Sequence, residues 1–325
     1  MSQTVYPVCV IGGGAAGVMA TLRTVLNNDT CLFFPGTPKD KKKSRALWVR
    51  KVENMPSHLQ YKRGIEDPNL ETLNWLAQSD FKEKLIWKKN VGVTHIEKLT
   101  NGHFKITTSK DEIFEAKFVI LCTGVMDVQP IIQGEIDPIF DYANAQTADY
   151  CLICDGHHVL NKRVAVIGHD NGAAWIAIML HERYGSQITI LTNGQKPQYQ
   201  KETSDLLVQY RVQTILPPIL SINGEEKGKV LHSFTLEDQQ VVEADICFVA
   251  LGMIVYNDLA KMVHAQIDER GFVIADESGQ SSIEGLYVAG DLRAKTRKQI
   301  YTSWDTAVTA ATSINQKLRA SKRPI

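Results

Sequence analysis

Two cysteines separated by two residues have the clearest chemical capacity in this sequence. Cys151 and Cys154 lie in the stretch C-L-I-C-D-G. A C-x-x-C spacing can close a small disulfide, and it can lower the pKa of one of the two thiols. Asp155 follows directly, so its carboxylate could move a proton during thiol–disulfide exchange, or it could simply form a turn with Gly156. The pair therefore predicts redox chemistry.

The same spacing also occurs in half of a tetrahedral zinc site, and a buried pair can be inert. A zinc site needs two further ligands, but the chain has six cysteines and no second C-x-x-C. His157 and His158 follow the motif but are poorly placed to close a tetrahedron with both cysteines. The remaining cysteines lie in apolar runs, as small buried residues do: Cys9, Cys31, Cys122 and Cys247. We therefore predict no metal site and a reducing compartment.

A glycine-rich turn near the N-terminus predicts a dinucleotide site. Gly12, Gly14 and Gly17 form G-x-G-x-x-G between the apolar run 8–11 and a helical pattern over 15–26. The first glycine permits a tight turn, the second lets the backbone approach a pyrophosphate, and the third lets the helix pack on the sheet. A glycine-rich turn without a ligand is the alternative. The usual acidic residue after the second strand is missing, so ribose recognition must come from elsewhere.

A second carboxylate could serve the same cofactor. The segment 285–291 reads G-L-Y-V-A-G-D, an apolar strand that ends in Gly-Asp. Asp291 could accept hydrogen bonds from a ribityl or sugar chain, or it could cap the following helix. Together with the N-terminal glycines, the motif favours the cofactor.

The elements that position these residues follow one plan twice. The pattern strand, helix, strand occurs first at residues 8–11, 15–26 and 31–34, and it recurs at residues 164–167, 172–184 and 188–191. This predicts an α/β protein with two Rossmann-like dinucleotide-binding domains. Segments 118–124 and 247–252 resemble each other and are predicted to be the crossings between domains. Residues 1–124 and 250–325 would form the first domain, and residues 125–249 an inserted domain with the cysteine pair.

Composition excludes several classes of protein. The 325 residues contain 36 Lys plus Arg and 36 Asp plus Glu, which argues against a surface that binds nucleic acid through its phosphates. The first residues lack the basic and apolar regions of a signal peptide, and the longest apolar run spans about half a membrane. We expect a cytoplasmic enzyme. The basic loop 39–45 is most simply solvated, and peripheral membrane contact through it stays open.

The order of motifs resembles that of the low-molecular-weight thioredoxin reductase family over nearly the whole chain. The motifs are G-G-G-A-A-G, V-E-N-M-P, C-T-G, C-L-I-C-D-G, V-A-V-I-G and G-L-Y-V-A-G-D. The resemblance implies a homodimer in which an NADPH domain that carries the cysteines interrupts an FAD domain. It implies that Cys154 faces the flavin, that Cys151 exchanges with substrate and that Asp155 is the acid–base group. The implied FAD contacts are Gly12, Gly14, Ala15, Ala16, Gly17, Asn54, Gly124, Asp291, Lys298, Gln299 and Ile300.

The second nucleotide site departs from this family. Asp170 replaces the middle glycine of G-x-G-x-x-A and places a charged side chain where a pyrophosphate should meet bare backbone. The family reads a 2′-phosphate with an arginine-rich stretch, but residues 192–198 read T-N-G-Q-K-P-Q. We therefore expect that NADPH is not the natural electron donor. A weaker NADPH enzyme is the alternative.

Four aromatic residues lie near the predicted sites: Trp48, Tyr301 and Trp304 stand where the family tends to have small or polar residues, and Trp175 opens the helix beside the altered fingerprint. Each alone is more typical of core packing, but as a set they could form a wall for a second ring system: Trp48, Trp175, Tyr301 and Trp304. The combination resembles the diflavin-linked disulfide oxidoreductases, a branch that lacks a working NADPH site, holds two FAD molecules and passes electrons from thiols to flavin. The ferredoxin-dependent flavin thioredoxin reductases also lack the NADPH motifs and run in the opposite direction.

These observations predict an FAD-dependent disulfide oxidoreductase. Electrons would pass between the Cys151–Cys154 pair and flavin without NADPH, from a thiol substrate or a thioredoxin-like protein, with a second FAD. The alternatives are an NADPH- or ferredoxin-dependent thioredoxin reductase that reduces protein disulfides, and a redox sensor without turnover.

Overall fold

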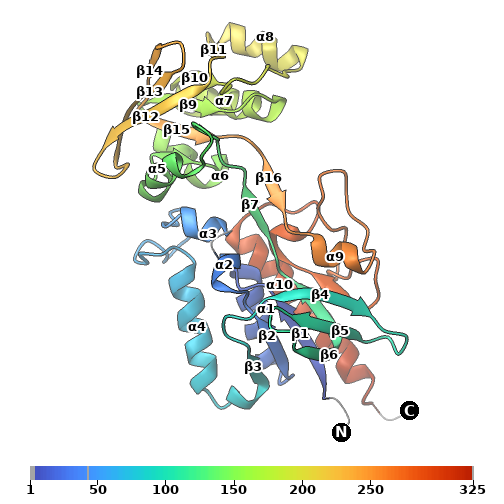
Figure 1. The fold of residues 1–325 in the computed structure, drawn as a ribbon. Helices are drawn as coiled ribbons and strands as arrows, with labels where there is room; N and C mark the ends of the chain where they lie inside the picture. Colours follow the sequence, from blue (N-terminus) through green and yellow to red (C-terminus); the bar gives the residue numbers. More distant parts are fainter. Residues whose placement is uncertain (1–3, 42–43, 324–325) are drawn as a thin grey trace. The chain divides into compact units, whose positions relative to one another are not determined.

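The computed structural model describes residues 4–41 and 44–323, and the chain divides into two compact units (Figure 1). Unit 1 comprises residues 1–47, 65–126 and 255–325, and unit 2 comprises residues 48–64 and 127–254. The two main crossings therefore fall slightly later than the predicted positions. Residues 48–64, which we predicted in the first domain, group with unit 2. Residues 42–43 of the basic loop lie outside the described residues.

Unit 1 is built on a seven-stranded sheet with the order β3-β2-β1-β6-β5-β4, to which β17 adds by pairing with β6. β1, β2, β3 and β17 run parallel to their neighbours, whereas β4 and β5 form an antiparallel extension. The strands are β1 Val5–Ile11, β2 Cys31–Phe34, β3 Leu85–Trp87, β4 Val93–Lys98, β5 Phe104–Thr108, β6 Ile113–Leu121 and β17 Leu286–Val288.

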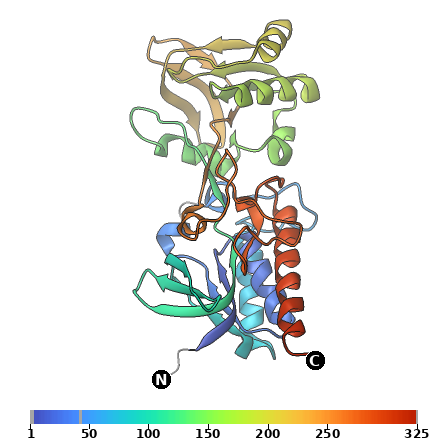
Figure 2. The ribbon, with the colours of Figure 1, turned by 90° about the vertical axis from the view of Figure 1, so that its right-hand side faces the viewer.

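Both faces of this sheet are covered, which explains why its parallel strands are continuous apolar runs. Val8 and Val10 of β1 face a core shared with α1, α4 and α10, whereas Cys9 and Ile11 face the opposite core. Figure 2 shows α10, in red, alongside α1, in blue. The helices of unit 1 are α1 Ala15–Leu26, α2 Pro38–Lys41, α4 Glu66–Gln78, α9 Asp258–Met262, α10 Ile300–Ala320, and the short turns η1 Lys82–Lys84 and η4 Gly290–Leu292.

Unit 2 repeats the plan with a parallel five-stranded sheet of order β11-β10-β9-β15-β8. Helices α7 and α8 share a core with one face, and the antiparallel sheet β12-β13-β14 and helix α5 share a core with the other. The strands are β8 Ala148–Asp149, β9 Arg163–Ile167, β10 Gln187–Leu191, β11 Gln213–Ile215, β12 Ile219–Glu225, β13 Val230–Leu236, β14 Val241–Glu243 and β15 Ile246–Val249. The helices are η2 Asp137–Ile139, α5 Phe140–Ala145, α6 Leu152–Asp155, η3 Gly156–Val159, α7 Asn171–Tyr184 and α8 Lys201–Gln209.

Three short elements lie at the crossings between units. β7 Val125–Asp127 pairs with β16 Met253–Val255 in a two-stranded sheet, and α3 covers Arg45–Trp48. The predicted class, α/β with two Rossmann-like units, is confirmed. Within the residues that the structure describes, every helix is too short or too polar to cross a bilayer.

Candidate functional site

The two cysteines of the C-x-x-C motif form a disulfide at the start of α6. Cys151 is the N-cap residue, and the backbone N–H of Cys154 donates to its carbonyl oxygen at 3.1 Å. Both cysteines are half-buried, whereas Asp155 is buried. A carboxylate oxygen of Asp155 and the two sulfur atoms lie within 4.8 Å of one another. The predicted acid–base group is therefore next to the atoms it would serve, but the separate roles of the two sulfurs stay a prediction.

A histidine beside the disulfide joins two carboxylates. His158 shares hydrogen bonds of 2.9 Å with Asp149 through Nδ1 and with Glu53 through Nε2. The hydrogen bond to Asp149 raises the pKa of His158 to about 9. The bond to His158 in turn holds the pKa of Glu53 below its ordinary value. Sequence reasoning missed this group, because Glu53 lies far from His158 in the chain.

The first glycine fingerprint leaves space for a phosphate. A Cβ atom on Gly12 would overlap the carbonyl of Cys122, and one on Gly17 would overlap the carbonyl of Gly12. A Cβ atom on Gly14 would meet nothing within 4 Å. Gly14 is also the N-cap of α1, so no side chain caps that helix, and its first N–H groups are free to bind an anion. These residues fit the pyrophosphate of FAD, and Ala15 and Ala16 form the first turn of α1.

Asp291 lies close to this fingerprint. A Cβ atom on Gly290 would come within 2.7 Å of Ala16 Cβ, so η4 packs against the first turn of α1. The N–H of Gly290 donates to Thr306 Oγ1 at 3.0 Å, and Ser303 Oγ donates to Asp291 at 3.4 Å. The carboxylate thus lies between α1 and α10, and its predicted contact with a ribityl chain stays a prediction.

The three residues predicted against the flavin ring lead into α10. Lys298 donates to the carbonyl oxygen of Arg293 at 2.7 Å, and its Nζ lies 3.9 Å from the centre of the Phe272 ring. Burial lowers the pKa of Lys298 to about 8. Gln299 is the buried N-cap of α10, and Ile300 is its first residue.

The last two predicted FAD residues, Gly124 and Asn54, belong to different units. Gly124 belongs to unit 1 and has φ +67°, and its carbonyl accepts from the N–H of Tyr256 at 3.1 Å. A Cβ atom on Gly124 would meet nothing within 4 Å, so space is open there as it is at Gly14. Asn54 lies in segment 48–64, so it groups with unit 2 and not with the other predicted FAD residues.

The second fingerprint is filled by the protein itself. Asp170 is the N-cap of α7, and its Oδ1 accepts from the N–H of Ala173 at 2.9 Å. Asn171 Oδ1 accepts from the N–H of Gln200 at 3.0 Å and from Thr203 Oγ1 at 2.6 Å. The Asp170 bond uses one N–H group at the start of α7, the helix end that holds a pyrophosphate in a dinucleotide fold, and the Asn171 bonds tie this end to the segment that begins α8. The aspartate that the sequence identified as an obstacle is therefore also a helix cap.

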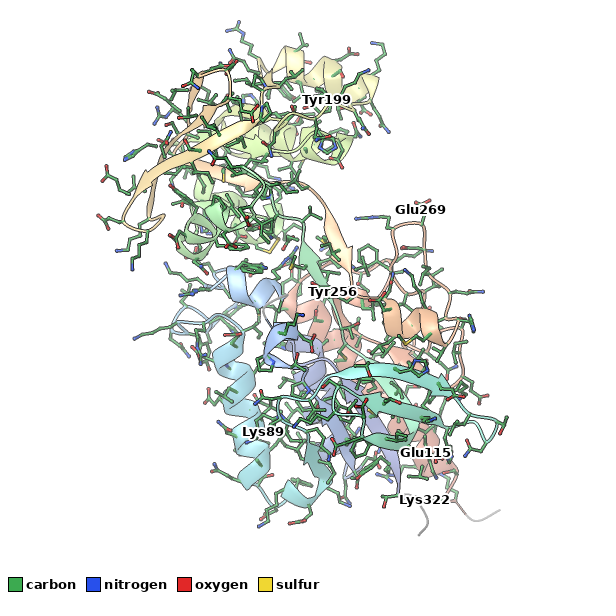
Figure 3. All side chains as sticks on the ribbon, in the orientation of Figure 1. Lys89, Glu115, Tyr199, Tyr256, Glu269 and Lys322 are labelled. Atoms are coloured by element: carbon green, nitrogen blue, oxygen red, sulfur yellow. A yellow bond between two sulfur atoms is a disulfide. The ribbon has the colours of Figure 1, made fainter. Side chains whose placement is uncertain are left out.

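The chain after β10 crosses the same end of α7. The N–H of Gln198 donates to the carbonyl of His169 at 2.7 Å, and the neighbouring Tyr199, labelled in Figure 3, packs partly buried against the core of unit 2. Burial raises the pKa of Tyr199, and the nearby Asp170 carboxylate adds to this rise. The residues that follow β10 thus contact the segment that leads into α7.

The stretch that would read a 2′-phosphate serves a structural role. Asn193 donates to the carbonyl of Ile131 at 2.9 Å and accepts from the N–H of Ile219 at 2.8 Å. Gly194 has φ +81°, and a Cβ atom there would lie 3.0 Å from Pro218. Both positions build a turn, so neither is free to contact a ligand through an added side chain.

The four aromatic residues predicted to form one wall lie in several environments. Trp48 stacks on Phe140 in unit 2, with ring centres 4.3 Å apart and planes inclined by 7°. Trp175 packs against the α7 core of the same unit. In unit 1, Tyr301 is exposed, and Trp304 lines a small cavity between α1 and α4. Core packing accounts for the first two, and a second-flavin role for the set stays a prediction.

Comparisons with known proteins agree with this architecture. The model of the family described as pyridine nucleotide-disulphide oxidoreductase matches residues 6–311. The thioredoxin reductase of Treponema pallidum is 26% identical over 321 residues, covering 95% of this chain and 96% of that protein. The thioredoxin reductase of Listeria monocytogenes is 24% identical over 308 residues, covering 93% and 90%.

Solved structures show the same fold. The putative thioredoxin reductase TrxB of Bacillus anthracis superimposes with a TM-score of 0.82 at 19% identity, covering 98% of this chain and 100% of that one. The thioredoxin reductase of Streptococcus pyogenes gives a TM-score of 0.81 at 22% identity, with the same coverage.

Proposed function

The chain belongs to the pyridine nucleotide-disulphide oxidoreductase family, and from that premise we propose that it exchanges electrons between Cys151–Cys154 and FAD without NADPH. It is a flavin-dependent disulfide oxidoreductase of the thioredoxin reductase type. The finer proposal adds a direction, from a thiol to flavin, and a second FAD that accepts the electrons. This corresponds to the diflavin-linked branch of the family.

One observation carries the independence from NADPH. The Asp170 carboxylate already accepts from the N–H of Ala173, at the helix end where a pyrophosphate would bind. The corresponding position in the first fingerprint is Gly14, which has no side chain and faces open space. The two fingerprints therefore differ at the residue that would meet the anion. Gly14 leaves the N–H groups of α1 open to a phosphate, whereas Asp170 places a negative charge at the start of α7.

The residues around the disulfide suit exchange with a thiol. A substrate thiolate attacks one sulfur, for which we propose Cys151; the S–S bond breaks, and Cys154 leaves as a thiolate. A second substrate thiolate displaces Cys151, so that the substrate leaves as a disulfide with the loss of two electrons. Asp155 takes up and returns the protons that the thiols release and the thiolates need. FAD, when bound in unit 1, supplies the two-electron acceptor that lets the protein disulfide re-form.

The proposed partner and the proposed second flavin rest on the resemblance to known proteins. Relatives over most of the chain are named thioredoxin reductases, so a thioredoxin-like dithiol protein is the proposed partner. The proposed homodimer follows the same resemblance. We propose that Trp304 and Tyr301, at the start of α10 in unit 1, contact the second flavin.

A second candidate is an NADPH-dependent thioredoxin reductase. The name of the matching family includes the pyridine nucleotide, and the full-length relatives carry the name of that enzyme. In this case the Asp170 cap would weaken NADPH binding without abolishing it. A ferredoxin-dependent thioredoxin reductase shares the absence of NADPH but reduces disulfides.

Steady-state turnover separates these functions. The flavin-loaded protein is supplied with an artificial electron acceptor and either a reduced dithiol protein or NADPH as donor. We expect dithiol-dependent reduction of the acceptor and no turnover with NADPH. Flavin released on denaturation should approach two per chain. NADPH-driven turnover with one flavin per chain would establish the second candidate instead.

A further inference from the structure

Two histidines and a glutamate of unit 2 point toward one position beside the disulfide. His157 Nε2 lies 3.0 Å and His158 Nε2 lies 2.9 Å from the same oxygen, Glu53 Oε2. The two imidazole rings have centres 4.3 Å apart, although they belong to consecutive residues of η3. Three potential metal ligands therefore converge, with all three ligand atoms within 4.8 Å of one another.

The spacing of these atoms is close to that of a zinc site. Zn²⁺ holds imidazole nitrogen and carboxylate oxygen at about 2.0–2.1 Å, and a tetrahedral arrangement then separates ligand atoms by about 3.3 Å. The observed nitrogen–oxygen distances of 3.0 and 2.9 Å need to widen by only a few tenths of an ångström. Half of the His157 side chain is exposed, so a fourth position can be filled by water.

The buried carboxylate of Asp149 forms a hydrogen bond with one of the three candidate ligands, His158. Asp149 is 3% exposed, and its Oδ2 lies 2.9 Å from Nδ1 of His158, the nitrogen that does not face Glu53. Metal-binding histidines typically donate their other N–H to a carboxylate, which fixes the tautomer and the ring orientation. His158 is thus already oriented with Nε2 toward the candidate metal position.

We propose that Glu53, His157 and His158 form a Zn²⁺ site, with Asp149 as the supporting carboxylate. The site is separate from the cysteine pair, whose sulfurs are bonded to each other. It adjoins that pair through Asp155, which lies within 4.8 Å both of the sulfurs and of the Asp149–His158 group. The sequence prediction of no metal considered these histidines only together with the cysteines. The proposal is independent of the flavin and of the proposed electron donor.

The test is zinc binding to the oxidised, flavin-loaded, tag-free full chain. After treatment with a chelator, the protein is titrated with Zn²⁺ against a chromophoric competitor. We expect one Zn²⁺ per chain. His157→Ala and Glu53→Gln should each weaken binding by at least about a hundredfold, and Asp149→Asn by about 10- to 100-fold. His157 and Glu53 are partly exposed, so these two variants should fold.

A matched control is present in the same unit. His232 also pairs with a glutamate, Glu225, at 3.0 Å and has 52% of its side chain exposed, compared with 51% for His157. Among the residues that the structure describes, this pair belongs to no group of three potential metal ligands. His232→Ala should leave zinc affinity unchanged. X-ray absorption should show nitrogen or oxygen neighbours at about 2.0–2.1 Å and no sulfur at about 2.3 Å. No binding at about 10 μM free Zn²⁺, equal binding by the Glu53 and His157 variants, or a sulfur neighbour would overturn the proposal.

Discussion

The side chain of Asp170 accepts a 2.9 Å hydrogen bond from the backbone N–H of Ala173, three residues later. This side chain thereby caps one N–H group at the start of α7, whereas the start of α1, at Gly14, has no capping side chain. We propose that these two helices, which occupy equivalent places in two similar units, differ for this reason in their capacity to bind a phosphate. This difference is the basis of the proposed independence from NADPH.

Removing the Asp170 cap should create NADPH affinity. Asp170→Gly costs only a few tenths of a kcal/mol of helix stability, so the variant should fold. Added arginines are best placed at the exposed Gln195 and Lys196, since Asn193 and Gly194 build the turn. Asp170→Gly with Gln195→Arg and Lys196→Arg should bind NADPH at least about tenfold more tightly than the wild type, as measured by calorimetry.

Asp170→Ser is the matched control for this design. Serine keeps a capping oxygen but removes the charge. Its NADPH affinity should fall between that of the wild type and that of the glycine variant. If all three proteins bind NADPH equally, the cap is not what blocks the site.

Gly14→Ala should reduce FAD binding without unfolding the chain. Gly14 has φ −76°, which alanine adopts readily, and the added methyl group meets no protein atom within 4 Å. It would instead occupy the space next to the free N–H groups of α1. We expect at least about a tenfold loss of FAD affinity with an unchanged denaturation midpoint for the flavin-free protein. Undiminished flavin content would show that the pyrophosphate lies elsewhere.

Asp155→Asn should slow thiol exchange at the disulfide. The amide keeps the shape of the side chain but cannot take up a proton, and loss of a general acid–base group typically costs about 10²- to 10⁴-fold in rate. Rapid mixing with a reduced dithiol protein measures the rate. Asp205→Asn, an exposed aspartate on α8, serves as control and should react at the wild-type rate. A wild-type rate in the Asp155 variant would remove this residue from the mechanism.

Stability should depend on pH through Lys298. Burial lowers its pKa from the ordinary value of 10.5 to about 8. Between these values the unfolded chain keeps a proton that the folded chain has lost, so the free energy of unfolding should rise with pH in this window. Denaturant unfolding of the flavin-free wild type should show this rise relative to Lys298→Gln. Parallel curves for the two proteins would mean that the lysine has an ordinary pKa.

Local patterns predicted the parts of the fold that depend on short stretches of chain. Strand 31–34 was predicted with the bounds that β2 has, and the overlap that a Cβ atom on Gly12 would cause bears out the turn argument. The disulfide also follows from local spacing. Glu53 and Asp149 were missed because only tertiary folding brings them to His158, and a single sequence carries no signal of that contact.

Two other predictions were incomplete, one because the residue has a second structural role and one because its contact is distant in the sequence. Asp170 was predicted as an obstacle to a pyrophosphate, and an aspartate before a helix is also a typical N-cap, which the structure shows it to be. Trp48 was grouped with Trp304 because both stand where the resembled family tends to have small or polar residues, but its stacking on Phe140 depends on a partner far along the chain. An aromatic residue in a sequence indicates burial, but the sequence does not indicate which ring that residue will contact.

The most direct test of the central claim is the flavin absorbance of the oxidised protein under anaerobic conditions. The protein is mixed in one experiment with a reduced dithiol and in another with NADPH, and the flavin band is followed over a single turnover. The account predicts rapid bleaching by the dithiol, at least about a thousandfold slower in Cys154→Ser but not in Cys247→Ala, and no bleaching by NADPH. Rapid bleaching by NADPH, or bleaching by the dithiol that survives in Cys154→Ser, would contradict it.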